Sequence, residues 1–174
     1  VLYKYGGIED WEVLATRVEG LPGVAAAAPL TRLQGMLGYG GRVQGVMITG
    51  IEPGVEERVS ILPQHMTEGE LESLQPGEFG VVIGELLARH LKVGMGDKIT
   101  MMLPEATLSP AGVLPRIKRV TVTGIFSVGA ELDSNLAVIN IDDARKLGRI
   151  DAEVQSLRIR FDDLFDAPAG IWEI

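Results

Sequence analysis

Residues 98–125 read KITMMLPEATLSPAGVLPRIKRVTVTGI, and this stretch decides the fold that we expect. Its two ends, residues 98–102 and 120–125, are strand-like runs of apolar and β-branched residues. Between them, residues 103–119 carry three prolines, several aliphatic side chains and a basic cluster. Because a hairpin connection usually takes about two to five residues, we expect an unusually long loop of roughly a dozen residues here.

The composition of this loop indicates a surface that binds a partner. Proline fixes φ and lowers the entropy of the free chain, so less entropy is lost when the loop is bound. The loop carries the aliphatic residues Leu108, Val113 and Leu114 and the basic residues Arg116, Lys118 and Arg119. The alternative is a floppy insertion whose prolines only guard against aggregation, because long loops are also where disorder is found.

On both sides of this stretch the pattern alternates between helices and strands. We expect helices over residues 11–18 (capped by Asp10), 85–91 and 141–147. We expect strands over residues 24–29, 31–39, 42–51, 81–84, 136–141 and 154–161. Gly40-Gly41 suits a tight turn that needs positive φ, so the strands on either side of it should pair. Mixed elements of this kind predict an α+β fold.

The order of the elements predicts two subdomains. Residues 1–52 and 136–174 share a strand–helix alternation, so we expect them to pack as one α+β subdomain. Residues 53–135 are strand-rich with one short helix, and we expect them to form an inserted β-rich subdomain that carries the hairpin loop 103–119.

Composition narrows the class of protein. The 174 residues can bury a core, and 22 glycines with only 5% aromatic residues indicate a turn-rich protein with an aliphatic interior. A formal net charge of −8 argues against nucleic acid as a partner, because phosphate binding depends on Lys and Arg. The lack of cysteine excludes disulfides, thiol catalysis and thiolate metal sites. No window approaches the ~20 apolar residues of a membrane span, and the abrupt ends suggest a piece of a longer protein.

The chain shows little catalytic or metal-binding pattern. His65 and His90 are the two histidines, and neither has the neighbours that a metal site needs, so we expect no metal and no cofactor. Glu131 and Asp133 flank Leu132 and leave open a soluble hydrolase that would use this carboxylate pair. A solvated acidic loop is the simpler interpretation, and we expect no catalytic residue.

Several segments together resemble a known family. They are residues 77–98 (GEFGVVIGELLARHLKVGMGDK), 108–116 (LSPAGVLPR), 124–126 with 129–133, 142–144, and the early segments 10–11 and 20–29. In this order and spacing they resemble the extracytoplasmic domain of the LolC/LolE family of lipoprotein-releasing ABC transporter permeases. The resemblance covers nearly the whole chain.

The resemblance implies a periplasmic domain of an inner-membrane protein, joined to the membrane through helices outside this chain. The fold would be like the periplasmic core of MacB-type transporters, a porter-like α+β subdomain with an inserted, mostly β subdomain that carries a long protruding hairpin. Expected partners are a second permease, a cytoplasmic ATPase subunit, the lipoprotein substrate and the periplasmic chaperone LolA. The domain itself would bind partners without being an enzyme.

In LolC members a hairpin between prolines, the hook, captures the chaperone. The residues here that match it are Leu108, Ser109, Pro110, Ala111, Gly112, Val113, Leu114 and Pro115, and Arg116 follows them. Val113 replaces a basic residue of the family's loop, and residues 129–133 resemble the LolE members of the family more than the LolC members. A paralogous permease domain that contacts lipid or lipoprotein without capturing the chaperone is therefore the alternative.

Overall fold

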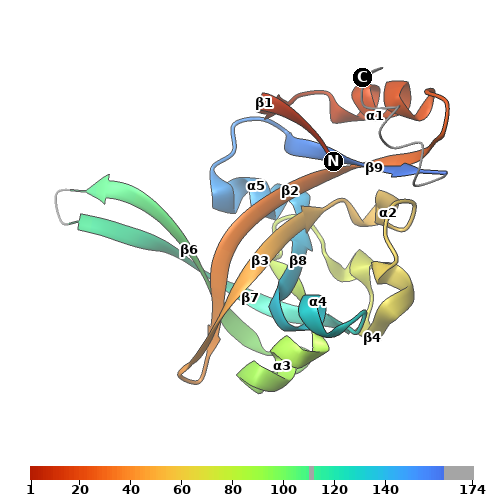
Figure 1. Cartoon of the computed structure of the whole chain (residues 1–174). Coiled ribbons are helices and arrows are strands. Elements are labelled where there is room, and N and C mark those ends of the chain that lie inside the picture. The colour runs from red at the N-terminus through yellow and green to blue at the C-terminus, as the bar shows by residue number, and fades with distance from the viewer. Residues whose placement is uncertain (110–111, 163–174) are drawn as a thin grey trace.

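Two long hairpins build most of one mixed sheet (Figure 1). The computed structural model describes residues 1–109 and 112–162. The strands are β1 (Leu2–Ile8), β2 (Val24–Tyr39), β3 (Arg42–Ile51), β4 (Met66–Gly69), β5 (Gly80–Gly84), β6 (Lys98–Ser109), β7 (Gly112–Phe126), β8 (Leu136–Asn140) and β9 (Val154–Phe161). The helices are α1 (Trp11–Glu19), α2 (Pro53–Glu56), α3 (Glu85–Leu91), α4 (Ala130–Asn135) and α5 (Ile141–Gly148), with 3-10 turns η1 (Leu62–His65) and η2 (Leu71–Ser73).

The sheet runs in the order β1-β9-β2-β3-β8-β5-β7-β4, and β6 pairs with both β7 and β2. The β3–β8 and β5–β7 pairs are parallel, whereas the other pairs are antiparallel. This mixture of helices and a mixed sheet agrees with the predicted α+β class. Strand β8 lies between β3 and β5, so one sheet runs through both predicted subdomains, and their division stays a prediction.

Aliphatic side chains form three buried clusters. The largest packs α3 and α5 against the sheet and includes Leu37, Ile48, Ile83, Leu87, Ile99 and Leu147. A second lies under α1 and includes Ala15, Val18, Val154 and Leu157. The third joins η1 and η2 to the sheet through Ile51, Leu62, Leu71, Val82, Phe126 and Val138. Among the described residues, no helix is long and apolar enough to cross a membrane.

Most expected elements are present, but several differ from the prediction. Residues 24–39 form one continuous strand, whose first half pairs with β9 and whose second half pairs with β3. Asp10 precedes α1 as predicted, but it caps through its backbone carbonyl, which accepts from the amides of Val13 and Leu14. Strand β1 was not expected from the sequence, and residues 130–135 form a short helix where a loop was expected.

The predicted loop of a dozen residues is wrong, because the two strands continue through it. The register pairs Leu103 with Arg116, Thr107 with Leu114 and Ser109 with Gly112, with a shift between the first two pairs. Residues 100–102 of β6 pair with β2. From there toward the end of the arm, no third strand among the described residues pairs with either β6 or β7, so both strands are edges. Proline is tolerated on an edge or at a bulge, where its missing amide breaks no central ladder. The outcome is a long two-stranded arm that extends well past the rest of the fold (Figure 1).

Candidate partner-binding hairpin and an apolar pocket

The arm leaves the sheet where β6 lies beside β2. Met36 pairs with Met102 there, and a Cβ added at Gly35 would lie only 2.6 Å from the Met102 carbonyl oxygen. The same Cβ would lie 2.7 Å from Cδ1 of the buried Ile48. Because the backbone and a packed core side chain both come this close, glycine is required at position 35, and this contact helps to set the direction of the arm.

Arg116 ties the arm to helix α5. Its Nη1 donates a 2.6 Å hydrogen bond to the carbonyl oxygen of Leu147, in the last turn of that helix. Carbonyls in a last turn lack helical partners and lie at the negative end of the helix dipole, so a guanidinium is well matched to them. The half-buried Arg116 thus holds the arm in place, while its predicted contact with a partner stays a prediction.

The other two basic residues of the arm differ in exposure. The Lys118 ammonium lies 3.6 Å from the centroid of the Phe79 ring, which is a cation–π contact inside the domain. Arg119 is exposed and makes a long hydrogen bond of 3.4 Å to the Lys98 carbonyl oxygen. Ile117, which precedes Lys118, is 63% exposed. Arg119 and Ile117 are therefore the residues at the base of the arm that face solvent.

The described members of the predicted contact set lie on this arm. Leu108 and Ser109 end β6, and Gly112, Val113 and Leu114 begin β7. Pro110 and Ala111 lie outside the described residues. Pro115 is exposed, and Arg116 follows it. The backbone register therefore brings the described members of the predicted set together at one end of a two-stranded arm.

Of the two acidic residues that left a hydrolase open, Asp133 has a structural role. Asp133 is buried, and its carboxylate accepts hydrogen bonds from Ser127 Oγ, the Val128 amide and the Gly129 amide at 3.0, 2.8 and 3.2 Å. It therefore holds the turn that starts α4, whereas Glu131 is exposed. Within residues 1–109 and 112–162, no group of three His, Asp or Glu side chains is placed to hold a metal ion.

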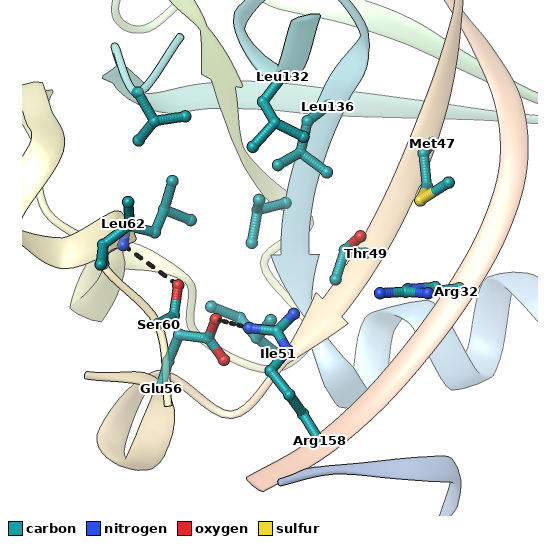
Figure 2. A pocket seen from close by; sticks show the side chains of 13 residues that line it. Arg32, Met47, Thr49, Ile51, Glu56, Ser60, Leu62, Leu132, Leu136 and Arg158 are labelled. Carbon is teal, nitrogen blue, oxygen red and sulfur yellow. Dashed lines mark hydrogen bonds and ion pairs between the residues drawn. The ribbon is translucent and has the colours of Figure 1, made fainter. Parts of the chain in front are cut away.

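An apolar pocket of about 290 Å3, which was not predicted from the sequence, lies on the opposite side of β3 and β8 from the main core. Figure 2 shows Leu132 and Leu136 at one end of it and Glu56 and Arg158 at the other. Its lining residues are Arg32, Met47, Thr49, Ile51, Glu56, Ser60, Ile61, Leu62, Val128, Leu132, Leu136, Val138 and Arg158. They come from five separate parts of the chain, so no local motif could have revealed the pocket.

An ion pair closes the polar end of this pocket. Arg158 Nη1 lies 2.5 Å from Glu56 Oε1, and Glu56 is only 2% exposed. Burial raises the pKa of the Glu56 carboxyl above its ordinary value of 4.5, while Arg158 and the Ser60 hydroxyl act in the opposite direction. Burial outweighs both of these favourable contacts, so keeping the Glu56 carboxylate charged lowers the stability of the folded domain.

Several proteins that are similar to this chain in sequence are named LolC or LolE. The chain is 41% identical over 161 residues to the lipoprotein-releasing system transmembrane protein LolC of Neisseria meningitidis serogroup B, covering 92% of this chain and 39% of that protein. It is 37% identical over 168 residues to LolC of Xylella fastidiosa, covering 96% and 39%. LolE of Haemophilus influenzae is 24% identical over 161 residues, covering 92% and 38%. The chain thus spans about two fifths of the length of these relatives.

Solved structures with a similar fold include extracytoplasmic domains of transporters. The extracellular domain of the ABC-type transporter YknZ from Gram-positive bacteria superposes with a TM-score of 0.61 and 12% identity, covering 96% of this chain and 80% of that one. The periplasmic region of MacB from Actinobacillus actinomycetemcomitans gives 0.59 and 14%, covering 91% and 68%. At these identities the likeness concerns the fold alone.

A sequence model of the MacB-like periplasmic core domain matches residues 4–169. Together with the LolC relatives, it confirms the predicted LolC/LolE resemblance, the periplasmic location and the class of a transporter component that is not an enzyme. The chain belongs to the MacB-like periplasmic core domain family.

Proposed function

We propose that this chain is the periplasmic domain of a permease subunit in an ABC transporter that releases lipoproteins from the inner membrane and passes them to the chaperone LolA. The names of the LolC relatives support the transporter, and 41% identity over nearly the whole chain supports the transfer of that role. The further partners would be a second permease, a cytoplasmic ATPase subunit and the lipoprotein itself.

The observation that carries the chaperone contact is the arm formed by β6 and β7. It extends past the rest of the fold (Figure 1), and its outer part carries Leu108, Val113 and Leu114 next to prolines. A hairpin held at its base by Gly35 and Arg116 loses little further freedom when its end is bound, which favours affinity. Burying an aliphatic side chain contributes about 1.5–3 kcal/mol before the costs of association, enough for a transient handover.

The structure changes the expected role of the basic residues in this contact. Arg116 and Lys118 already interact within the domain, so Arg119 is the best candidate for a rim contact with an acidic partner surface. Rim charges act mainly on association rate. Titration of this domain with purified LolA, with and without charged substitutions on the arm, tests the proposal.

The alternative is a paralogous domain that contacts lipid or lipoprotein without capturing the chaperone. The 24% identity to LolE of Haemophilus influenzae over 161 residues favours keeping this second candidate. The two roles differ in one outcome, because only the first requires the free domain to bind LolA through the arm.

A further inference from the structure

The pocket beside β3 and β8 gathers exposed aliphatic side chains from three elements around one opening. Ile61 before η1 is 60% exposed, Leu132 on α4 is 50% exposed, and Met47 on β3 is 42% exposed. Single exposed apolar residues are ordinary on a protein surface, but a set that converges on a concave site marks a place for an apolar ligand. The buried Ile51 and Val138 form part of the wall.

The same pocket is cationic at one side. Arg158 is paired with Glu56, so these two charges offset each other. Arg32, on β2, is exposed, and no carboxylate among the described residues pairs with its guanidinium. A guanidinium presents a planar fork of donors that fits a carboxylate in a bidentate manner. The pocket therefore offers an apolar wall and one available cation.

These features point to a flexible aliphatic anion. None of the 13 lining residues is aromatic, so the pocket offers no platform for stacking a base or another flat ring. A volume of 290 Å3 equals about ten water molecules at liquid density, and a methylene group is of similar size. We infer that the pocket binds a medium-chain fatty acid of about ten carbons, with its carboxylate on Arg32 and its chain along Met47, Leu136 and Leu132.

This inference is independent of the proposed chaperone contact. Arg32 and the other pocket residues are separate from residues 103–119, and none of the described residues of the arm lines the pocket. Loss of chaperone binding on changing the arm and loss of fatty-acid binding on changing the pocket would therefore be distinct results.

Titration of this domain with sodium decanoate, followed by backbone amide chemical shifts, tests the inference. We expect saturable shifts in residues around the pocket, including Met47 and Leu136, at decanoate concentrations where the ligand is monomeric. Decyltrimethylammonium has the same chain and the opposite charge, and we expect it to bind at least tenfold more weakly. If decanoate produces no saturable shifts, or if the cationic amphiphile binds equally well, the inference is wrong.

Two variants separate the head group from the chain. Arg32→Gln should weaken decanoate binding at least tenfold and leave the weaker binding of the uncharged decanol unchanged. Leu132→Trp should fill the opening and weaken both ligands, with the amide spectrum of the rest of the domain confirming the fold. Arg42→Gln, on the same pair of strands but outside the pocket lining, is the matched control and should bind decanoate like the unchanged domain. An equal effect of the Arg32 and Arg42 substitutions would overturn the assignment of the carboxylate to Arg32.

Discussion

Arg116, on the projecting arm, donates a hydrogen bond from Nη1 to the carbonyl oxygen of Leu147, in the last turn of α5. The bond joins two parts of the chain separated by 31 residues and by a strand, a helix and a turn. A residue that sequence reasoning assigned to partner binding therefore also fixes the arm on the domain. A rigidly held arm loses less entropy when a partner binds it, as a partner-binding module requires.

Replacing Arg116 should destabilise the domain more than replacing its neighbour. Arg116→Gln removes a half-buried, charge-assisted hydrogen bond, and we expect the free energy of unfolding to fall by about 1–3 kcal/mol. Arg119→Gln removes only an exposed contact and should change it by less than about 0.5 kcal/mol. Urea unfolding followed by circular dichroism measures both. Equal effects of the two substitutions would show that the bond to Leu147 does not hold the arm.

The close approach at Gly35 makes a second prediction. Gly35→Ala places a methyl group 2.6 Å from the Met102 carbonyl oxygen, so β2 and β6 must separate, and we expect a loss of about 1–3 kcal/mol in the free energy of unfolding. Gly45→Ala is the control, because nothing lies within 4 Å of its added Cβ, and it should be neutral or slightly stabilising. Thermal unfolding of both variants distinguishes them. If the Gly35 variant were as stable as the Gly45 variant, the close approach of β2 and β6 at Gly35 would be contradicted.

Glu56 should make stability depend on pH. Burial raises the pKa of Glu56 above 4.5 in the folded domain, so the folded state binds this proton more tightly than the unfolded state does. The contribution of this group to stability is therefore fully present below pH 4.5 and is lost as the pH rises through the folded pKa. In Glu56→Gln this part of the pH dependence should vanish. Urea unfolding at a series of pH values, with Glu57→Gln as the exposed control, tests this, and an unchanged slope in Glu56→Gln would refute it.

The ion pair with Arg158 lowers the free energy that burying the charged Glu56 carboxylate costs. Arg158→Gln removes the attraction that lowers the pKa of Glu56, so that pKa should rise further in the variant. At neutral pH we expect a loss of about 1–3 kcal/mol in the free energy of unfolding, less than for a fully buried pair because Arg158 is 23% exposed. Titration of the Glu56 side chain by NMR measures the pKa directly. A Glu56 pKa that does not rise in Arg158→Gln would mean that the pair is not formed in solution.

The two acidic residues of α4 should differ in how much they contribute to the stability of the domain, and neither should have a catalytic role. Asp133→Ala leaves the Ser127 hydroxyl and two backbone amides without their acceptor, and we expect a cost of about 1–3 kcal/mol. Glu131→Ala, two residues away and exposed, should be nearly neutral. Thermal unfolding of the two variants checks this. A neutral Asp133 substitution would contradict its role in starting the helix.

Local patterns predicted the elements that have strong periodicity. The strand at 154–161 and the helix at 85–91 were expected with their observed bounds, because clear alternation and a leucine-rich face are direct consequences of strand and helix geometry. Prediction was wrong where context overrides propensity. The prolines at 104 and 115 indicated a loop, but in a two-stranded arm they lie on edges and do not break a central ladder.

The site was only partly accessible from sequence. The resemblance led to the contiguous residues 108–116 as the predicted contact site, and their role in binding stays a prediction. The resemblance could not show that Arg116 is held by α5, because Leu147 is remote in the chain. The pocket was not predicted for the same reason, because Glu56 and Arg158, which pair in it, are 102 residues apart in the sequence. Contacts between distant segments depend on sheet order, and no pattern in the sequence defined that order.

The most direct test of the proposed function is calorimetric titration of this domain with purified LolA. We predict micromolar binding by the unchanged domain and its loss in a Leu108→Asp, Leu114→Asp double variant. Val13→Asp, a matched charge introduced at a 71% exposed aliphatic position on α1, should bind like the unchanged domain. If the folded domain does not bind LolA, or if the double variant binds as well as the unchanged domain, chaperone capture by the arm is contradicted.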